Sequence, residues 1–375
     1  MRLSRHFSWF GDDSCLLVIG IAGEKPRNLE LALAFGLHHA GDRALKIVLP
    51  KARARHSTRD GGATQRRLPW IAAPAQLYSF DRSNEVTPLP ALSKLDVESW
   101  YTSHPPVSRD HELEANGAWV DRLRHWADNE EDLVAAHRSS YLAWHCEGRL
   151  VLKIVRTKSG FKVSAGLHSQ SDPPTTALLA GPLARQTHHH LVAAASVAMA
   201  NRIEGTDNAN AEHRLQEQLA GAHAALGLRA RPRREVPAFR ASGERGYIDL
   251  LGADEAGTTR VIETKIGPDS MLVLQGLDYW SWCRAHQKEL GLLVGADPTR
   301  EPALDFALAK KDDTWFSVYT AAQLKSLDPS ISWRVHTIEH GPAGSSVESS
   351  ADREVPPVAL AKPTALEAAD SSGED

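Results

Sequence analysis

The sequence predicts an α/β protein with three folded parts and a C-terminal tail. A strand, helix, strand pattern near the N-terminus predicts an α/β region of Rossmann-like type. Short strand-like runs between two helices predict a small α+β middle region. Farther along, the order helix, three strands, helix, strand predicts an αβββαβ core. We place these parts at residues 1–110, 111–204 and 205–340, with the tail at 341–375.

Composition excludes several classes of protein. Hydrophobic residues make up 42% of the chain, which is enough for globular cores. The sequence has no apolar run of membrane-spanning length and no signal-peptide core, so we expect a cytoplasmic protein without a membrane partner. Cys15, Cys146 and Cys283 form no CxxC pair, so we expect neither a disulfide framework nor a structural zinc site.

The N-terminal region, 1–110, begins with the predicted strand, helix, strand unit. Apolar runs at 15–23 and 44–50 predict the strands, and helical spacing at 28–41 predicts the helix between them. Gly20 and Gly23 lie at the first turn of this unit. A tight turn is the simpler interpretation of these glycines, and admission of a phosphate to the helix N-terminus is the alternative.

Two further segments of this region lack periodicity. Residues 51–69 are basic and contain glycine, so we expect a solvated loop, with phosphate contacts as the alternative. The arginines clustered in this segment are Arg53, Arg55, Arg59, Arg66 and Arg67. Residues 83–110 are rich in proline and serine, which predicts a linker.

The middle region, 111–204, alternates between helical and strand-like patterns. We expect a helix over 112–140, two or three strands over 141–169, and a second helix over 188–203. The tail at 341–375 consists largely of small residues, proline and acids, and it has no aromatic residue. Such a segment buries too little apolar surface to offset the entropy of ordering, so we expect it to be disordered.

The third region carries the predicted αβββαβ order. The expected elements are a helix over 208–228, strands over 233–240, 246–253 and 259–267, a helix over 270–289, and a short buried strand over 290–296.

The strand at 259–267 carries an acid and a base on one face. Because side chains alternate along a strand, Glu263 and Lys265 point the same way, about 7 Å apart at their bases. A turn near 254–258 brings Asp249, on the preceding strand, beside Glu263. Two carboxylates with a backbone oxygen suit Mg²⁺, and a nearby lysine stabilises charge in a transition state. The sequence therefore predicts a site for metal-assisted hydrolysis of a phosphodiester.

Asp249 followed by Glu263-Thr264-Lys265, in this order of elements, resembles the PD-(D/E)XK nuclease superfamily, which includes restriction endonucleases and RecB-type nucleases. The resemblance covers about residues 205–325 and implies a restriction-endonuclease-like core. It also implies that Asp249, Glu263 and the carbonyl of Thr264 bind Mg²⁺, for which Mn²⁺ would substitute. Lys265 would then be the catalytic lysine.

Other positions extend this resemblance. Gln275 and Tyr279 match the QxxxY element of the RecB-like branch and are implied to hold a phosphate or the substrate strand. The family's first-helix glutamate, a further metal ligand, matches Glu212 best, with Glu217 in reserve. Ile248 stands where the family name has proline, and this variation leaves the metal ligand in place.

The resemblance therefore implies a Mg²⁺-dependent endonuclease that hydrolyses DNA, with RNA left open. Arginines on the approach to the site are predicted to contact nucleic-acid phosphates, namely Arg233, Arg234, Arg240 and Arg245. We expect a homodimer in which the N-terminal region targets or regulates the nuclease, in genome defence or repair. Two alternatives remain open: an inactive nucleic-acid-binding protein, and a nuclease activated by a nucleotide signal bound to the N-terminal domain.

Overall fold

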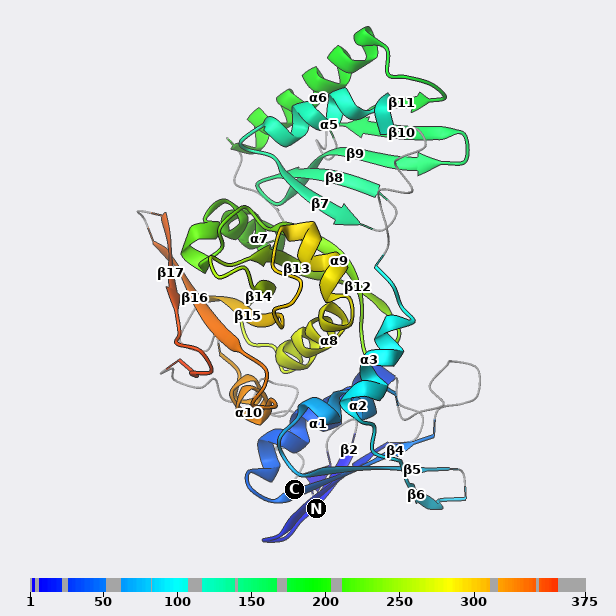
Figure 1. The fold of residues 1–375 in the computed structure, drawn as a ribbon, viewed down its shortest axis with the longest axis vertical. Helices are drawn as coiled ribbons and strands as arrows, with labels where there is room; N and C mark the ends of the chain where they lie inside the picture. Colours follow the sequence, from blue (N-terminus) through cyan, green and yellow to red (C-terminus); the bar gives the residue numbers. More distant parts are fainter. Residues whose placement is uncertain are drawn as a thin grey trace, which may run out of the picture.

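The protein has a mixed α/β fold built around two sheets (Figure 1). The C-terminal part lies at the centre of the long axis, between the N-terminal part at one end and the middle part at the other (Figure 1). The computed structural model describes residues 2–3, 7–21, 26–51, 62–81, 83–106, 117–138, 141–166, 174–203, 211–310, 316–341 and 344–356.

The N-terminal part is a sheet on which helix α1 (Pro26–Ala40) packs. Its strands follow chain order across the sheet: β1 (Arg2–Leu3), β2 (Phe7–Gly11), β3 (Cys15–Gly20), β4 (Ala44–Pro50), β5 (Ala75–Phe80) and β6 (Val86–Pro88). Strands β3, β4 and β5 are parallel to one another. Because α1 joins β3 to the parallel strand β4, the predicted strand, helix, strand unit is confirmed.

The structure describes one of the two glycines of the first turn. A Cβ on Gly20 would lie 2.8 Å from Leu29 Cδ2, so this glycine allows close packing of α1 on β3. Gly23 lies outside the described residues. The packing role of Gly20 agrees with the simpler interpretation of a tight turn.

The segment at 51–69 is not a solvated loop throughout. It contains α2 (Gly62–Arg67), which is followed by the short 3₁₀ helix η1 (Leu68–Trp70). Arg66 and Arg67 are only 4% and 2% exposed, so the prediction that they contact phosphate is wrong. The other three arginines of the cluster, Arg53, Arg55 and Arg59, lie outside the described residues.

The predicted linker at 83–110 contains a helix, α3 (Lys94–Thr102). Ser93 caps it: its hydroxyl accepts a hydrogen bond from the Asp96 backbone N–H, and the Asp96 carboxylate accepts one from the Ser93 backbone N–H. This capping box starts a helix within a segment whose proline and serine content predicts a linker. Helix α3 packs against the C-terminal part, so it is a structural contact and not a spacer.

The middle part is an antiparallel sheet with two helices on one face (Figure 1). Its elements are η2 (Gly117–Trp119), α5 (Asp121–Asn129), β7 (Val134–Arg138), β8 (Tyr141–Cys146), β9 (Arg149–Thr157), β10 (Gly160–Ala165), β11 (Thr175–Leu179) and α6 (Arg185–Ile203). The helix expected over 112–140 is therefore wrong beyond Asn129. Residues of β7 pair with β8 in a hairpin and with the distant strand at 233–239, and this pairing overrides the weak helical preference of Val-Ala-Ala-His.

The C-terminal part continues the same sheet. Strand β7 pairs with β12 in parallel, and the order then runs β12, β13, β14, β15, β16, β17. The elements are α7 (Ala211–Gly221), η3 (His223–Leu226), β12 (Arg233–Phe239), β13 (Arg245–Ala253), β14 (Thr259–Ile266), α8 (Leu272–Ala285), α9 (Gln287–Val294), β15 (Ala303–Lys310), α10 (Val318–Ser326), β16 (Trp333–Gly341) and β17 (Gly344–Ser349). Helix α7 packs on one face of this sheet and α8 on the other.

Two predicted elements in this part are wrong. The strand expected over 290–296 is largely the helix α9, and the strand that pairs with β14 is β15. Leu290, Leu293 and Val294 are spaced to suit a helix as well as a short apolar strand, so periodicity alone does not separate the two. The tail is also not disordered from residue 341, because β17 pairs with β16 as an edge strand. Residues 357–375 lie outside the described residues.

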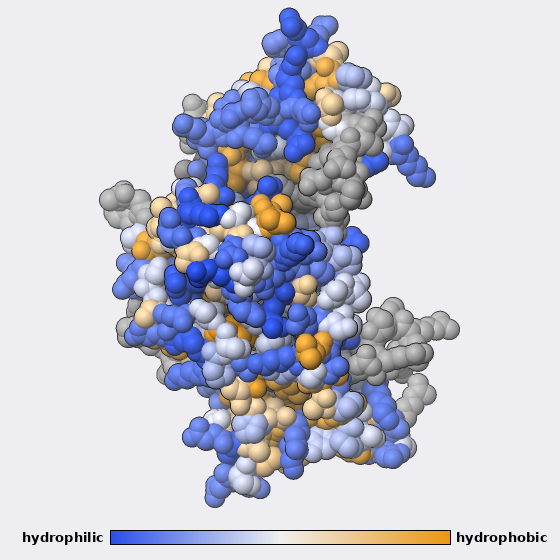
Figure 2. All heavy atoms as spheres, in the orientation of Figure 1, coloured by the Kyte–Doolittle hydropathy of each residue, from blue (hydrophilic) through white to orange (hydrophobic). Residues whose placement is uncertain are grey.

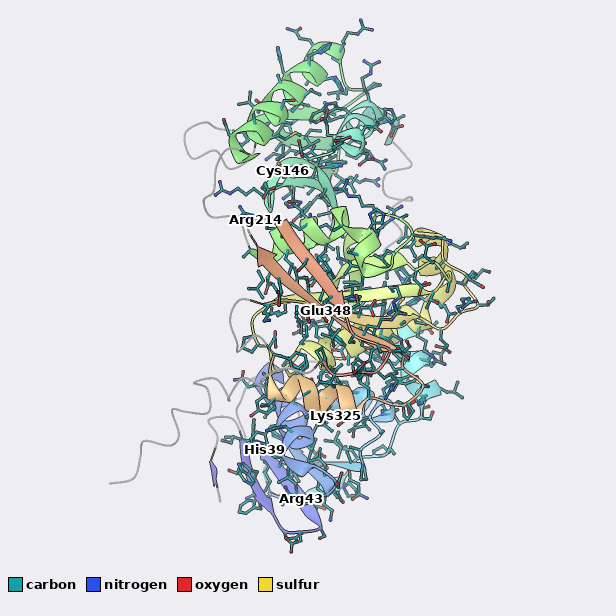
Figure 3. All side chains as sticks on the ribbon, turned by 90° about the vertical axis from the view of Figure 1, so that its left-hand side faces the viewer. His39, Arg43, Cys146, Arg214, Lys325 and Glu348 are labelled. Carbon is teal, nitrogen blue, oxygen red and sulfur yellow. The ribbon has the colours of Figure 1, made fainter. Side chains whose placement is uncertain are left out.

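The parts are joined by apolar and charged contacts. One hydrophobic core contains residues of both the N-terminal and the C-terminal parts, including Trp70 and Trp280, whose rings lie 4.9 Å apart. Figure 3 shows Lys325, on α10, next to the end of α1 that carries His39. It also shows Arg214 of α7 below Cys146, where an ion pair of 3.3 Å joins Arg214 to Glu147.

Within the described residues, no helix has both the length and the apolar content needed to cross a membrane.

A buried ion pair fastens the N-terminal part to α8, and its loss should destabilise the protein. Arg67 donates hydrogen bonds of 2.7 and 2.6 Å to Asp278 and lies 2.8 Å from Glu30. Arg67→Met leaves Asp278 buried without its partner, so we expect the free energy of unfolding to fall by about 3–5 kcal/mol. Urea unfolding followed by circular dichroism measures this loss.

Two variants control this experiment. Arg67→Met combined with Asp278→Leu removes both charges, and we expect it to recover much of the lost stability. Arg124→Met breaks only an exposed ion pair with Asp121, so its effect should stay below about 0.5 kcal/mol. Equal losses in Arg67→Met and Arg124→Met would contradict the structural role of the buried pair.

Candidate active site

The pairing of β13 with β14 brings two carboxylates close together. The antiparallel register pairs Leu250 with Ile262 and Leu251 with Val261, and it ends next to Asp249. There the Asp249 carboxylate accepts a hydrogen bond from the backbone N–H of Thr264, the residue after Glu263. The charge of Asp249 also contributes to the raised pKa of Glu263, so the two predicted metal ligands are neighbours in the structure.

Asp249 is held by the strand beside it. One of its carboxylate oxygens, Oδ2, accepts hydrogen bonds of 2.8 Å from both the backbone N–H and the hydroxyl of Thr264. Burial nevertheless raises the pKa of Asp249 to about 6, because these two bonds only partly replace hydration. The carboxylate thus lies in a setting that disfavours its negative charge.

Glu263 is the most buried member of the site, with 1% of its surface exposed. Its Oε2 accepts a hydrogen bond of 3.0 Å from Gln275, and its Oε1 is buried without a hydrogen-bond partner. Burial, and then the charge of Asp249, raise the pKa of Glu263 well above its usual value. A buried carboxylate oxygen with no donor is uncommon in folded proteins and is costly unless a cation or proton satisfies it.

Lys265 lies at the open edge of the site. Its Nζ is 2.8 Å from Glu212 of α7 and 3.5 Å from Asp269, and the lysine side chain is 30% exposed. Burial works against its charge, but the hydrogen bond to Glu212 and the charge of Asp269 outweigh this and raise the pKa of Lys265. Two carboxylates therefore hold the Lys265 side chain in place as a charged ammonium group.

The contacts of Glu212 and Glu217 show which of these two candidates of α7 lies at the site. Glu212 contacts Lys265, whereas Glu217 is buried, pairs with Arg234 at 3.1 Å and accepts a hydrogen bond of 2.6 Å from the Gly148 N–H. Glu217 therefore anchors the middle part to α7 and lies outside the site. Asp269 is a site neighbour that the sequence analysis missed. The spacing of four residues between Lys265 and Asp269, across the Gly-Pro turn, is the signal for it.

Gln275 and Tyr279, both on α8, have different contacts. Gln275 contacts Glu263 directly, so it orients that carboxylate. Tyr279 is 1% exposed, and its hydroxyl accepts hydrogen bonds of 3.2 Å from both Arg240 Nε and the Tyr247 N–H. A Cβ on Gly246 would lie 2.2 Å from this hydroxyl, so a glycine is needed there. The structure therefore gives Tyr279 a packing role between α8 and β13.

Two further residues at the end of α8, Trp282 and His286, contact α3 and not the site. Trp282 donates a hydrogen bond of 2.8 Å to the His104 carbonyl, and His286 lies 3.1 Å from the Tyr101 carbonyl. His286 is buried, with 4% of its surface exposed. Both residues instead fix the end of α3 against α8.

The four predicted nucleic-acid contacts do not form one surface. Arg234 is fully buried and pairs with Glu217 and Gln216, so the prediction that it contacts phosphate is wrong. Arg240 bonds Tyr279 at the side of the site. Arg233 and Arg245 are exposed and lie at opposite ends of the β12–β13 hairpin. Sequence spacing could not distinguish these environments, because the buried partner of Arg234 comes from another element.

The carboxylate pair has some of the features of a divalent-cation site. Asp249, Glu263 and the carbonyl of Thr264 offer hard oxygen ligands, and the unpartnered Glu263 Oε1 leaves one position for a positive charge. Within the described part of the chain, no cluster of three or more His, Cys, Asp or Glu side chains is arranged to hold a metal. Because Glu212 is directed to Lys265, the residues fit an ion held by two carboxylates and completed by water.

Comparison of the chain with protein families, with curated proteins and with solved structures found no match. The contacts of Asp249, Glu263 and Lys265 are therefore the observations that bear on its chemistry.

The raised pKa of Asp249 predicts an unusual dependence of stability on pH. Between about pH 4 and pH 6 the folded protein keeps a proton that the unfolded chain releases. The free energy of unfolding should therefore fall as pH rises through this window, and the loss should be complete above about pH 6. Urea unfolding at several pH values, with a chelator present, measures it.

Asp249→Asn removes this titration. Its stability relative to the wild type should increase from pH 4 to pH 6. Asp297→Asn serves as the control: hydrogen bonds from Thr299 lower the pKa of Asp297, so this group titrates below about pH 4 and the variant's stability relative to the wild type should stay level from pH 4 to pH 6. A constant difference between Asp249→Asn and the wild type across this range would show that the carboxylate is not destabilised by burial.

Proposed function

We propose that this chain is a Mg²⁺-dependent nuclease with a restriction-endonuclease-like core, and that DNA is its substrate. The observation that carries the proposal is the pair of neighbouring carboxylates, the partly buried Asp249 and the buried Glu263, with Lys265 two residues after Glu263 on β14. The order α7, β12, β13, β14, α8, β15 around this pair supports the same fold, with α9 as an addition before β15.

The chain's own residues have separable tasks in this proposal. Asp249, Glu263 and the Thr264 carbonyl would hold Mg²⁺, which when bound lowers the pKa of water and neutralises phosphate charge. Gln275 fixes the rotamer of Glu263 by its hydrogen bond to Oε2. Lys265, which Glu212 and Asp269 hold in its charged form, stabilises the negative charge that develops on the phosphate.

The N-terminal part is placed to influence this site. Arg67 bonds Asp278, which lies one helical turn from Gln275 on α8. A shift of the N-terminal part relative to α8 would therefore change how Gln275 meets Glu263. This connection supports our proposal that the N-terminal part regulates the nuclease.

Cleavage assays with matched variants test the proposed activity. We expect the wild type to cleave single- or double-stranded DNA with Mg²⁺ or Mn²⁺ and to lose cleavage when a chelator is added. Lys265→Met should slow cleavage by about 100-fold or more, because it removes one charge from the transition state. Lys310→Met, in a more exposed ion pair with Glu339 on the next strand, should leave the rate unchanged.

Direct metal binding separates the roles of the site residues. In calorimetric titrations with Mg²⁺, Asp249→Asn and Glu263→Gln should lose binding, whereas Lys265→Met should retain it. Cleavage that survives in both Lys265→Met and Asp249→Asn would refute the proposed activity. Mg²⁺ binding by the wild type without cleavage of DNA or RNA would instead favour a nucleic-acid-binding protein that keeps the fold.

A further inference from the structure

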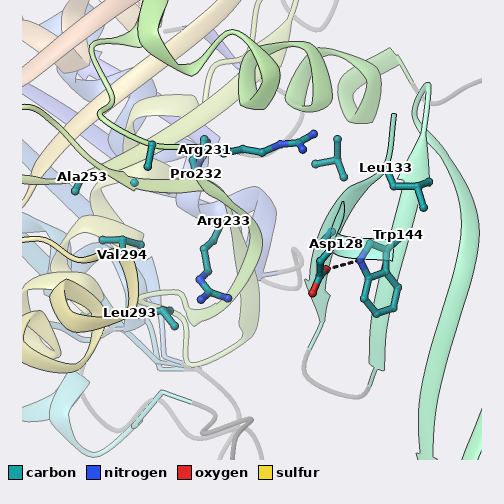
Figure 4. Close-up of a pocket in the computed structure, with 13 residues that line it drawn as sticks. Asp128, Leu133, Trp144, Arg231, Pro232, Arg233, Ala253, Leu293 and Val294 are labelled. Atoms are coloured by element: carbon teal, nitrogen blue, oxygen red, sulfur yellow. Dashed lines mark hydrogen bonds between the residues drawn. The ribbon is translucent and has the colours of Figure 1, made fainter. Parts of the chain in front are cut away.

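A cavity lies where the middle part meets the C-terminal part (Figure 4). Its volume is about 320 Å³. The walls come from α5, β7 and β8 on one side, and from α9, the start of β12 and the end of β13 on the other. None of the three residues Asp249, Glu263 and Lys265 lines it, so it is separate from the candidate active site.

Two arginines give this junction pocket its charge. Arg233 is the first residue of β12, and Arg231 lies two residues before it, outside the strand; both line the cavity. Figure 4 shows the Arg231 side chain extending toward Leu133 and the Arg233 side chain extending toward Leu293. Asp128 is the acidic residue of the lining, and its Oδ1 accepts a hydrogen bond of 2.8 Å from the Trp144 indole. The two guanidinium groups therefore outnumber the single carboxylate.

Apolar side chains form the other walls of the pocket. Leu133 and Trp144 lie on the side of the middle part, and Leu293 and Val294 lie on the side of α9. Leu293 is 39% exposed. Apolar residues also reach the surface between these two parts in the space-filling view (Figure 2). Apolar walls on two sides suit a flat, weakly polar group.

We propose that the junction pocket binds a single nucleotide. Its phosphate would bind Arg231 and Arg233, and its base would lie between Leu293 and Val294 on one side and Leu133 on the other. Guanidinium groups match phosphate oxygens in charge and in geometry. The cavity volume is at the lower end of the range for small-molecule sites, which fits one nucleotide and excludes a longer segment. The nucleotide would contact both parts and so stabilise their relative placement.

Calorimetric titration of the full chain, without divalent metal, tests this site with defined probes. We expect saturable binding of mononucleotides such as AMP, and weaker binding of both inorganic phosphate and adenosine, each of which lacks one half of the ligand. Arg231→Met combined with Arg233→Met should weaken AMP binding by about tenfold or more, since charge-assisted hydrogen bonds are lost. Arg156→Met, on the exposed side of β9, should leave it unchanged.

A second pair of variants tests the apolar wall. Leu293→Asp brings a negative charge into the pocket and should also weaken AMP binding by about tenfold or more. Leu292→Asp changes a neighbouring leucine that is 66% exposed and does not line the pocket, so it should bind AMP as the wild type does. Thermal unfolding of each variant verifies that it folds.

Several results would overturn the proposal. Equal affinities for AMP and inorganic phosphate would show a simple anion site without base recognition. Binding of a DNA ten-mer without binding of AMP would show that the arginines serve a polynucleotide surface. Unchanged AMP affinity in both the double arginine variant and Leu293→Asp would place the nucleotide elsewhere. These tests need no cleavage activity, so they can fail or succeed independently of the proposed nuclease function.

Discussion

The register between β13 and β14 is the constraint on which the candidate active site depends. A slip of one residue would move Asp249 away from Thr264 and Glu263. The register is fixed on both strands. Thr264 of β14 binds Asp249 through its N–H and its hydroxyl, and Tyr279 of α8 fills the space over Gly246 of β13. The site is thus a consequence of packing that extends well beyond it.

Comparison with the other buried acids shows how Asp249 and Glu263 differ from them. Among the other buried acids, Glu217, Asp278 and Asp305 each accept hydrogen bonds from an arginine, and Glu235 lies 3.3 Å from His213. Although burial opposes its charge, Asp305 has a pKa lowered to about 2, mainly by Arg260. Burial raises the pKa values of Glu217 and Asp278 as it raises those of Asp249 and Glu263, but the latter two bond the uncharged groups of Thr264 and Gln275. The fold neutralises its structural acids and leaves these two uncompensated, which is the pattern expected of a functional site.

Local patterns in the sequence were sufficient to place β13, β14 and α8, because each is long enough for its periodicity to show. They also predicted Asp249 beside Glu263, whereas Gln275 entered only through the resemblance to a family motif. They failed where a partner on another element decides the outcome. Arg234 looks like a surface arginine until Glu217 closes over it, and β7 looks helical until β8 and β12 pair with it. The helix α9 shows the remaining limit, since its apolar residues fit two periodicities and only the position of β15 separates them.

The C-terminal part is held from two sides by different interactions. On the α8 face, Arg67 of the N-terminal part binds Asp278, one turn from the glutamine that orients Glu263. On the α7 face, the backbone of Gly148 in the middle part binds Glu217, whose other oxygen pairs with Arg234 of β12. Both contacts are buried and charged, so each depends strongly on geometry. A change in the placement of either flanking part would therefore reach the sheet that carries the candidate site through a specific residue. Because each flanking part makes such a contact with the central C-terminal part, this arrangement suits control of the candidate site from both ends of the long axis.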